Sequence, residues 1–473
     1  MQQLSSIDSM FLYQELDNAP MHIAGLAIYD PSTANNGFVR FKDILRTYHD
    51  RLHLSPMFRR KLVQVPLNVD YPYWVEDADF DLEYHVRHIA LPKPGDWRQL
   101  CILVARLHSR PLDLNRPLWE ATIIEGLDNI PGLPEGSYAV LTKVHHAAID
   151  TLEGSGLARA LHTRAPEDRA AEPETPWRPE RTPSAAELLA RTYGNNIKSP
   201  LQMARVLSDA MPSVARMRAG MRLSEEKRSG KPKTRFNGAI SAHRVFGAVD
   251  MPLDDIRAIR DKVEGATVND VVVAIVAGGL RRYLEGKREL PTSSLVAGVP
   301  LNVRGENEDT STNTIHMPSI EIHTDIADPL DRVRAVNFEM DEVGAYKKAV
   351  SAKAIARKTV AVPASLTALG SRKAFETALA NRFDVPFNTI ITNVPGPADP
   401  VYMTGAKMVR AYELSPIQES LGLTHSVFSY NGSQSITFQA CREMLPDPDA
   451  YNDALQASFA EMRAAAGLAV AAA

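Results

Sequence analysis

The sequence predicts an α/β protein built from two domains of comparable size. Its 473 residues exceed what one ordinary hydrophobic core accommodates. Segments patterned as strands and as helices occur in both halves of the chain. Residues 163–185 are rich in Pro, Glu and Arg and hold few large apolar side chains, so they cannot build a core. We therefore expect a first domain over 1–162, a crossover with a helical segment over 163–236, and a second domain over 237–473.

The composition argues against nucleic-acid partners and indicates the cellular compartment. Hydrophobic residues make up 44% of the chain, and the net charge is −4, whereas a general nucleic-acid binder is normally basic. Cys101 and Cys441 stand far apart in no CxxC arrangement, which fits a reducing cytosol. The N-terminal residues lack the features of a secretion signal, and no apolar run approaches the roughly 20 residues that span a bilayer. We expect a cytoplasmic protein without nucleic-acid partners, soluble or bound peripherally to the membrane or to lipid droplets.

Strands and helices alternate along the first half. A short helix ends at the break Asp17–Pro20, and apolar patterning then predicts a strand over 21–29. A strand around Trp119 and a second over 138–144 are expected to pair across the loop between them. Helical periodicity also marks 41–54, 99–109 and 185–223.

The second half repeats this mixture. Asn431-Gly432 marks the tip of a β-hairpin. Thr267 or Asn269 is expected to cap a long helix that ends near Gly286. Further strands are predicted at 243–249, 294–305, 315–324 and 388–395, and further helices at 253–262, 329–349, 351–381 and 451–465.

The motif HHxxxD lies where the strand over 138–144 meets a helix predicted to start near residue 152. Its members are His145, His146 and Asp150. An imidazole has a pKa of about 6.5, so it can take a proton from a hydroxyl and return it at neutral pH. Asp150 could orient a ring or hold the turn. The alternative is a satisfied histidine pair that caps a core strand.

Two further polar residues, and the lack of several known catalytic motifs, limit the reactions that the sequence supports. Glu15 and His22 flank the first break, where a surface acid and a packed ring are the ordinary expectation. The chain has no GxSxG elbow, so a serine-hydrolase nucleophile is missing. It has no Walker A or GxGxxG loop and no HExxH or Cys/His set, which leaves nucleotide chemistry and a metal site unsupported.

Several motifs in order resemble the bacterial wax ester synthase/acyl-CoA:diacylglycerol acyltransferase family. They are FLYQE, PMHIAGL, WVEDADFDLEYHVRHIALP, RPLWE and KVHHAAID, followed by TVNDVVVAIVAGGLR, VPLNVR and TNVPGP. The resemblance covers nearly the whole chain. It implies mixed-sheet α/β sandwiches forming two chloramphenicol-acetyltransferase-like domains, with a channel between them and the histidines at its middle.

The resemblance implies an O-acyltransferase that moves a long-chain acyl group from acyl-CoA to diacylglycerol, a fatty alcohol or both. His146 would be the general base, acyl-CoA the co-substrate, and no cofactor or covalent intermediate would be required. Asn269 and Glu15 match polar family positions and are candidates near the reacting oxygen. Thr151 stands where the family usually has Gly. Two alternatives therefore stay open: a same-fold acyltransferase with another alcohol acceptor, and a catalytically weak lipid-binding paralogue.

The last expectation concerns how the two domains are joined. A buried Asp150 needs a partner, and Lys143 precedes the histidines on a strand that could direct it outward. The wider HHxxxD superfamily implies an aspartate–arginine pair across the domains, and Arg304 closes a predicted strand of the second. We therefore expect Arg304 to bind Asp150, with a solvated strand terminus as the alternative.

Overall fold

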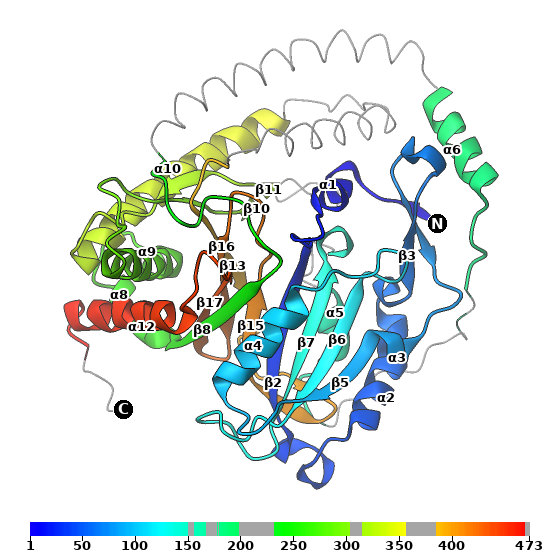
Figure 1. Ribbon diagram of the computed structural model, residues 1–473, viewed down its shortest axis with the longest axis horizontal. Helices are drawn as coiled ribbons and strands as arrows, with labels where there is room; N and C mark the ends of the chain where they lie inside the picture. Colours follow the sequence, from blue (N-terminus) through cyan, green and yellow to red (C-terminus); the bar gives the residue numbers. More distant parts are fainter. Residues whose placement is uncertain are drawn as a thin grey trace.

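Two six-stranded mixed sheets, each covered by helices, form the core of the computed structural model (Figure 1). The structure describes residues 1–149, 156–166, 177, 179–197, 231–302, 315–355 and 385–468. The predicted α/β class with mixed sheets is confirmed. Asp150, Thr151 and Arg304 lie outside the described residues, so the predicted Asp150–Arg304 pair remains a prediction.

The first sheet has the strand order β14-β15-β2-β7-β6-β5. Its central strands, β2 and β7, are antiparallel, and the predicted pairing of the strand at Trp119 with the strand over 138–144 is confirmed as β6 beside β7. The strands are β2 (His22–Asp30), β5 (Val86–Ala90), β6 (Trp119–Glu125), β7 (Tyr138–His145), β14 (Tyr402–Met403) and β15 (Ala406–Leu414).

The second sheet has the order β12-β9-β13-β16-β17-β8. The predicted hairpin at Asn431-Gly432 joins β16 to β17, and both turn residues adopt positive φ, as a tight hairpin turn requires. The strands are β8 (Arg244–Pro252), β9 (Val296–Gly298), β12 (Ser319–Glu321), β13 (Thr389–Pro395), β16 (Leu423–Tyr430) and β17 (Ser433–Cys441).

Residues from the C-terminal half complete the first sheet. β15 pairs with β2 over Ala24–Asp30, although more than 370 residues separate the two strands in sequence. In Figure 1, β15 lies on the side of β2 that faces the second sheet. The domain boundaries predicted at 1–162, 163–236 and 237–473 remain a prediction, but segment 402–414 of the predicted second domain belongs to the first sheet.

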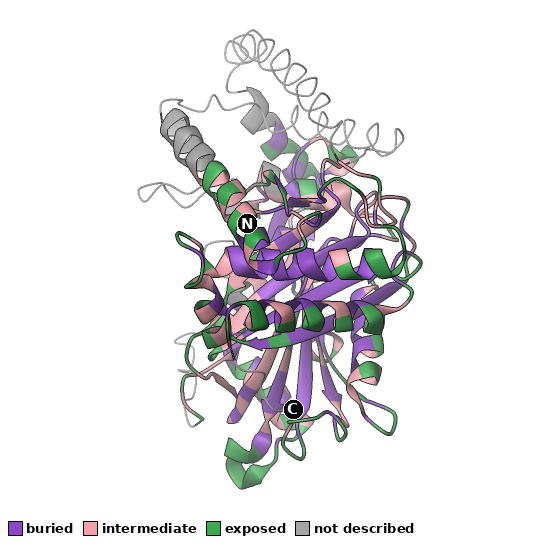
Figure 2. Cartoon of the chain, turned by 90° about the vertical axis from the view of Figure 1, so that its left-hand side faces the viewer, coloured by how far each residue is buried: buried purple, intermediate pink, exposed green. Residues whose placement is uncertain are grey.

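Helices pack against the sheets and bury their apolar faces. α4 (Trp97–His108) packs Leu100 and Val104 against Leu26 and Leu141 of the first sheet. α8 (Leu253–Arg260), α9 (Val268–Gly286) and α12 (Pro448–Ala465) enclose the core of the second sheet, together with the start of α10 (Pro329–Ile355). Figure 2 shows the strands mostly buried and the helices exposed on their outer faces.

The remaining elements lie around these layers. Short strands form a three-stranded sheet and a separate two-stranded pair. Each of the single strands predicted over 294–305 and 315–324 is broken into two short strands, one in the pair and one in the second sheet. These elements are β1 (Gln2–Gln3), β3 (Arg60–Val63), β4 (Tyr73–Glu76), β10 (Leu301–Asn302), β11 (Ile315–His316), α1 (Ser6–Gln14), α2 (Phe41–Arg51), α3 (Leu82–His85), α5 (Gly156–Leu161) and α6 (Ala185–Ile197).

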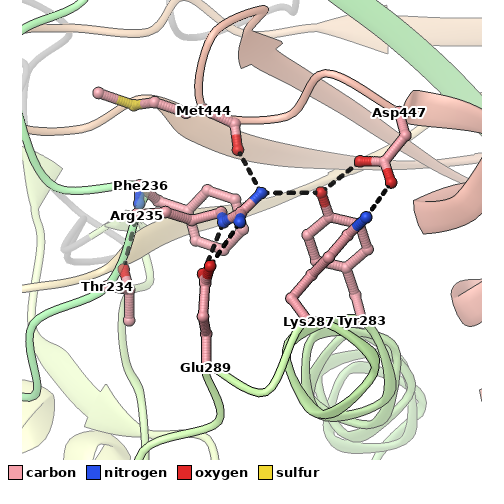
Figure 3. A network of polar contacts seen from close by, with 8 residues as sticks. All are labelled: Thr234, Arg235, Phe236, Tyr283, Lys287, Glu289, Met444 and Asp447. Carbon is pink, nitrogen blue, oxygen red and sulfur yellow. Dashed lines mark hydrogen bonds and ion pairs between the residues drawn. The ribbon is translucent and has the colours of Figure 1, made fainter.

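A polar network holds the start of the second half against its helices (Figure 3). Arg235 donates to both carboxylate oxygens of Glu289, at 2.7 and 2.6 Å. It also donates to the Tyr283 hydroxyl, which in turn donates to Asp447 at 2.5 Å. Lys287 also binds Asp447. Because the guanidinium engages the carboxylate in bidentate fashion, it fixes where the chain enters the second sheet.

Candidate active site

The two histidines lie at the end of β7, as predicted. His145 is the last residue of the strand, and a single 3₁₀ turn, η6 (His146–Ala148), follows. Nδ1 of His145 accepts the Ala147 N–H at 3.0 Å, which leaves the ring proton on Nε2. The His146 N–H donates to the Met21 carbonyl at 2.9 Å. The turn is therefore stabilised by one hydrogen bond within it and by a second to Met21, the residue before β2.

Glu15 lies beside His145. It follows α1 directly, and its Oε2 lies 3.4 Å from Nε2 of His145, while its Oε1 accepts the Met21 N–H at 3.3 Å. Its side chain is only 10% exposed, so the ordinary expectation of a surface acid was wrong. A carboxylate next to the Nε2–H of His145 orients that ring, since it favours a proton on that nitrogen.

His146 occupies a different environment from His145. Its ring stacks on Phe11 of α1, with centroids 4.7 Å apart, and stays partly exposed, whereas His145 is fully buried. Desolvation and, to a smaller degree, His145 lower the pKa of His146 to about 4. The imidazole is therefore unprotonated at neutral pH, which is the state a general base requires.

We expect the acid limb of a pH–rate profile to reflect this shift. As the pH falls through about 4, His146 takes up a proton and loses its capacity as a base, so kcat/KM should fall there. Between about pH 5.5 and 7 this group should cause no loss. A profile with its acid midpoint near the ordinary histidine value of about 6.5 would contradict this reading. Circular dichroism at each pH controls for acid unfolding.

A second pair of buried imidazoles lies behind the junction. His22 is paired with His145 across β2 and β7, and its Nε2–H donates to the His108 carbonyl at 2.8 Å. Nδ1 of His108 lies 2.7 Å from the side-chain amide nitrogen of Gln439, on β17 of the second sheet. Burial is the largest cause that lowers the pKa of both rings, to about 3 in His108. The packed ring expected at His22 is confirmed, but the cross-sheet link through His108 had no signal in the sequence.

Lys143 points inward, contrary to the expectation that it could face outward. Its ammonium donates to the Arg110 carbonyl at 2.9 Å and lies 3.3 Å from Glu120, and burial lowers its pKa. Its side chain is therefore occupied by Glu120 of β6 and by the Arg110 carbonyl just after α4. Trp119 is a packing residue, as expected: it is buried and its indole N–H donates to the Phe58 carbonyl at 3.0 Å.

Asn269 lies in the first turn of α9, where Thr267 is the cap. Its Oδ1 accepts from the side chain of Asn393, a residue of β13, at 3.1 Å. Across the described part of the chain, no hydrogen bond or ion pair joins Asn269 to His145 or His146. Glu15 is thus the predicted polar candidate that contacts the histidine junction.

Residues of the second half of the chain form hydrogen bonds with Asn18, in the turn between α1 and β2. Arg244 of β8 donates to the Asn18 carbonyl, and the Asn18 side chain donates to the Ile240 carbonyl at 2.9 Å and to Glu419 at 2.8 Å. Asn18 lies between Glu15 and Met21, both of which touch the histidine turn. Residues of the two sheets therefore fix the junction jointly.

Comparisons with known proteins agree with this arrangement. Residues 4–272 match the model of the wax ester synthase/diacylglycerol acyltransferase catalytic domain, and residues 311–463 match the WS/DGAT C-terminal domain. The chain belongs to the WS/DGAT family. A putative diacylglycerol O-acyltransferase of Mycobacterium tuberculosis (strain ATCC 25618 / H37Rv) is 32% identical over 98% of this chain and 100% of its own length. The family resemblance drawn from the motifs is confirmed, and the protein is an acyltransferase of this type.

Solved structures place the WS/DGAT chain in a wider fold group. The wax ester synthase/diacylglycerol acyltransferase from Marinobacter aquaeolei VT8 has a TM-score of 0.68 and 27% identity, covering 99% of this chain and 100% of that one. The first condensation domain of the calcium-dependent antibiotic synthetase has a TM-score of 0.55 at 15% identity, covering 99% and 97%. At that identity the likeness concerns the fold alone.

Proposed function

We propose that this protein transfers a long-chain acyl group from acyl-CoA to the hydroxyl of diacylglycerol, forming triacylglycerol, or of a long-chain alcohol, forming a wax ester. The observation that carries this proposal is the His146 ring, which lies partly exposed at the end of β7 and stacks on Phe11. Its lowered pKa, about 4, favours the unprotonated form that a general base requires. Membership of the WS/DGAT family supports the choice of donor and acceptors.

His146 would act as the general base. It takes the proton of the acceptor hydroxyl while that oxygen attacks the thioester carbonyl of the acyl-CoA. The C–S bond breaks, the new ester C–O bond forms, and the proton passes to the sulfur of the departing CoA. No covalent acyl-enzyme and no cofactor are needed, because the base and two aligned substrates suffice.

Other residues would support the base. Glu15 is proposed to hold the His145 ring in its Nε2–H form, so that His145 can accept the Ala147 N–H and shape the turn. Asn269 is proposed to donate a hydrogen bond to the reacting oxygen. Asp150 is proposed to hold the histidine turn in place. Asp150 and Arg304 are still proposed to pair.

Product analysis with purified protein tests the function. Palmitoyl-CoA supplied with hexadecanol should yield a wax ester, and supplied with dipalmitoylglycerol should yield triacylglycerol, each with stoichiometric release of CoA thiol. Thin-layer chromatography separates the two products. Palmitoyl-CoA binding with no product from either acceptor would instead support the lipid-binding alternative.

Substrate delivery requires contact with a lipid phase. Among the described residues, no helix combines the length and the hydropathy needed to cross a bilayer. We propose that the protein meets its water-insoluble acceptor at the surface of a membrane or lipid droplet. Flotation with vesicles that contain diacylglycerol measures this contact.

A further inference from the structure

Gly25 leaves a space beside the middle of β2. It lies in a central strand, between Thr142 of β7 and Glu413 of β15. A Cβ atom built on it would meet no heavy atom of the described residues within 4 Å, and its φ lies outside the left-handed region. Neither the backbone conformation nor a close neighbour therefore requires glycine here. Glycine inside a strand often marks a place where a ligand approaches the backbone closely.

Thr142 and Glu413 flank this space on the same face of the sheet. Residues directly opposite each other on antiparallel strands project to the same side, and Gly25 is opposite both. The other face is closed, because Leu26 and Leu141 pack beneath α4 there. A ligand group beside Gly25 would thus meet a hydroxyl on one side and a carboxyl on the other.

The space lies farther along β2 from the histidine junction. Met21, which accepts the His146 N–H, precedes Gly25 by four residues. A strand rises about 3.4 Å per residue, so Gly25 is about 14 Å along the sheet from Met21. A long-chain lipid that reacts at His146 has the length to reach it.

Glu413 has a carboxyl oxygen that lacks a partner. Its Oε2 is covered by protein, and no hydrogen bond reaches it from the described residues. Burial raises the pKa of this carboxyl to about 7. A buried polar atom without a partner is costly, and a hydrocarbon chain beside it would leave it unpaired. A hydroxyl group could donate to the carboxylate or accept from the protonated carboxyl.

We propose that the space beside Gly25 binds a second hydroxyl group of the lipid substrate, recognised by Glu413 with Thr142, so that the protein prefers hydroxylated long-chain lipids. This inference rests on the proposed function. The transfer itself is unchanged: the thioester C–S bond breaks, the ester C–O bond forms at the first hydroxyl, and the proton goes to CoA. The second hydroxyl is bound but does not react.

The second hydroxyl could belong to either substrate, and two arms of one experiment separate the sources. In the first, palmitoyl-CoA is paired with dodecane-1,12-diol or with 1-dodecanol. In the second, hexadecanol is paired with 12-hydroxydodecanoyl-CoA or with dodecanoyl-CoA. In one arm the wild-type kcat/KM should favour the hydroxylated compound by roughly tenfold or more, since a buried polar site discriminates strongly against an analogue that leaves it unpaired.

Variants identify the group responsible. Glu413→Met should abolish the preference and raise kcat/KM for the plain chain, because a thioether does not require a hydrogen-bond partner. Glu413→Gln should retain most of the preference, since an amide still pairs with a hydroxyl. Gly25→Val should remove the preference by filling the space. The matched control is Glu321→Met, which changes an exposed glutamate on β12 of the second sheet and should alter nothing.

Two results would overturn the inference: wild-type ratios within about twofold in both arms, or a preference that survives Glu413→Met. A binding measurement separates this failure from that of the proposed function. Dodecane-1,12-diol should raise the thermal unfolding midpoint more than 1-dodecanol does, and Glu413→Met should cancel the difference. If no acceptor is acylated but this difference is found, the proposed function fails and the hydroxyl site stands.

Discussion

Replacing His146 by Ala is expected to lower kcat by roughly 10²–10⁴ while the protein stays folded, since that is the usual contribution of a positioned base. The ring is partly exposed and its principal contact is a stack on Phe11, so the fold depends little on it. CoA release under saturating palmitoyl-CoA and hexadecanol measures the loss, and thermal unfolding measures the fold.

Two histidine variants provide the comparison for this result. His145→Ala should lower the unfolding midpoint as well as the rate, because it removes the acceptor of the Ala147 N–H and leaves Glu15 without its neighbour. His49→Ala, at a side chain 73% exposed, should change neither quantity. Wild-type turnover in a folded His146→Ala protein would rule out the base mechanism.

Arg244→Met is expected to lower the free energy of unfolding by about 3 kcal/mol and to reduce turnover as well. Its guanidinium donates to the Asn18 and Ser241 carbonyls, and the residue is only 5% exposed. Hydrogen bonds from a charged group are each worth about 1.5–3 kcal/mol, and their loss here would leave carbonyls without donors. The pKa of Arg244 is lowered to about 10, chiefly by burial, so the group remains charged at neutral pH.

The effect on turnover arises because Asn18 lies between Glu15 and Met21, which hold the histidine turn. Urea unfolding and steady-state kinetics at saturating substrate measure the two effects. Arg257→Met is the matched control: this arginine pairs with Asp254 on the surface of α8 and is 53% exposed, so its loss should cost little. An Arg244→Met protein with unchanged stability would show that the second half does not clasp this turn.

Local patterns were sufficient for many of the helices and strands and for the histidine junction. The alternation in 138–144 predicted β7, Asn431-Gly432 predicted the hairpin of β16 and β17, and Thr267 was one of two expected caps of α9. In each case the residues that determine the structure are neighbours in sequence, through strand periodicity, turn conformation or capping. The position of His145 and His146 at the end of a strand followed from the same patterns.

The tertiary structure alone decided which distant residues meet. Nothing in segment 406–414 indicates that β15 pairs with β2, because pairing partners depend on long-range packing rather than on a strand's own alternation. For the same reason, the contacts of Glu15 with His145, of His108 with Gln439 and of Arg244 with Asn18 were not predictable. From sequence alone, a charged or polar side chain is expected to be exposed. Only the folded chain places beside it the partner that offsets the free-energy cost of burying it.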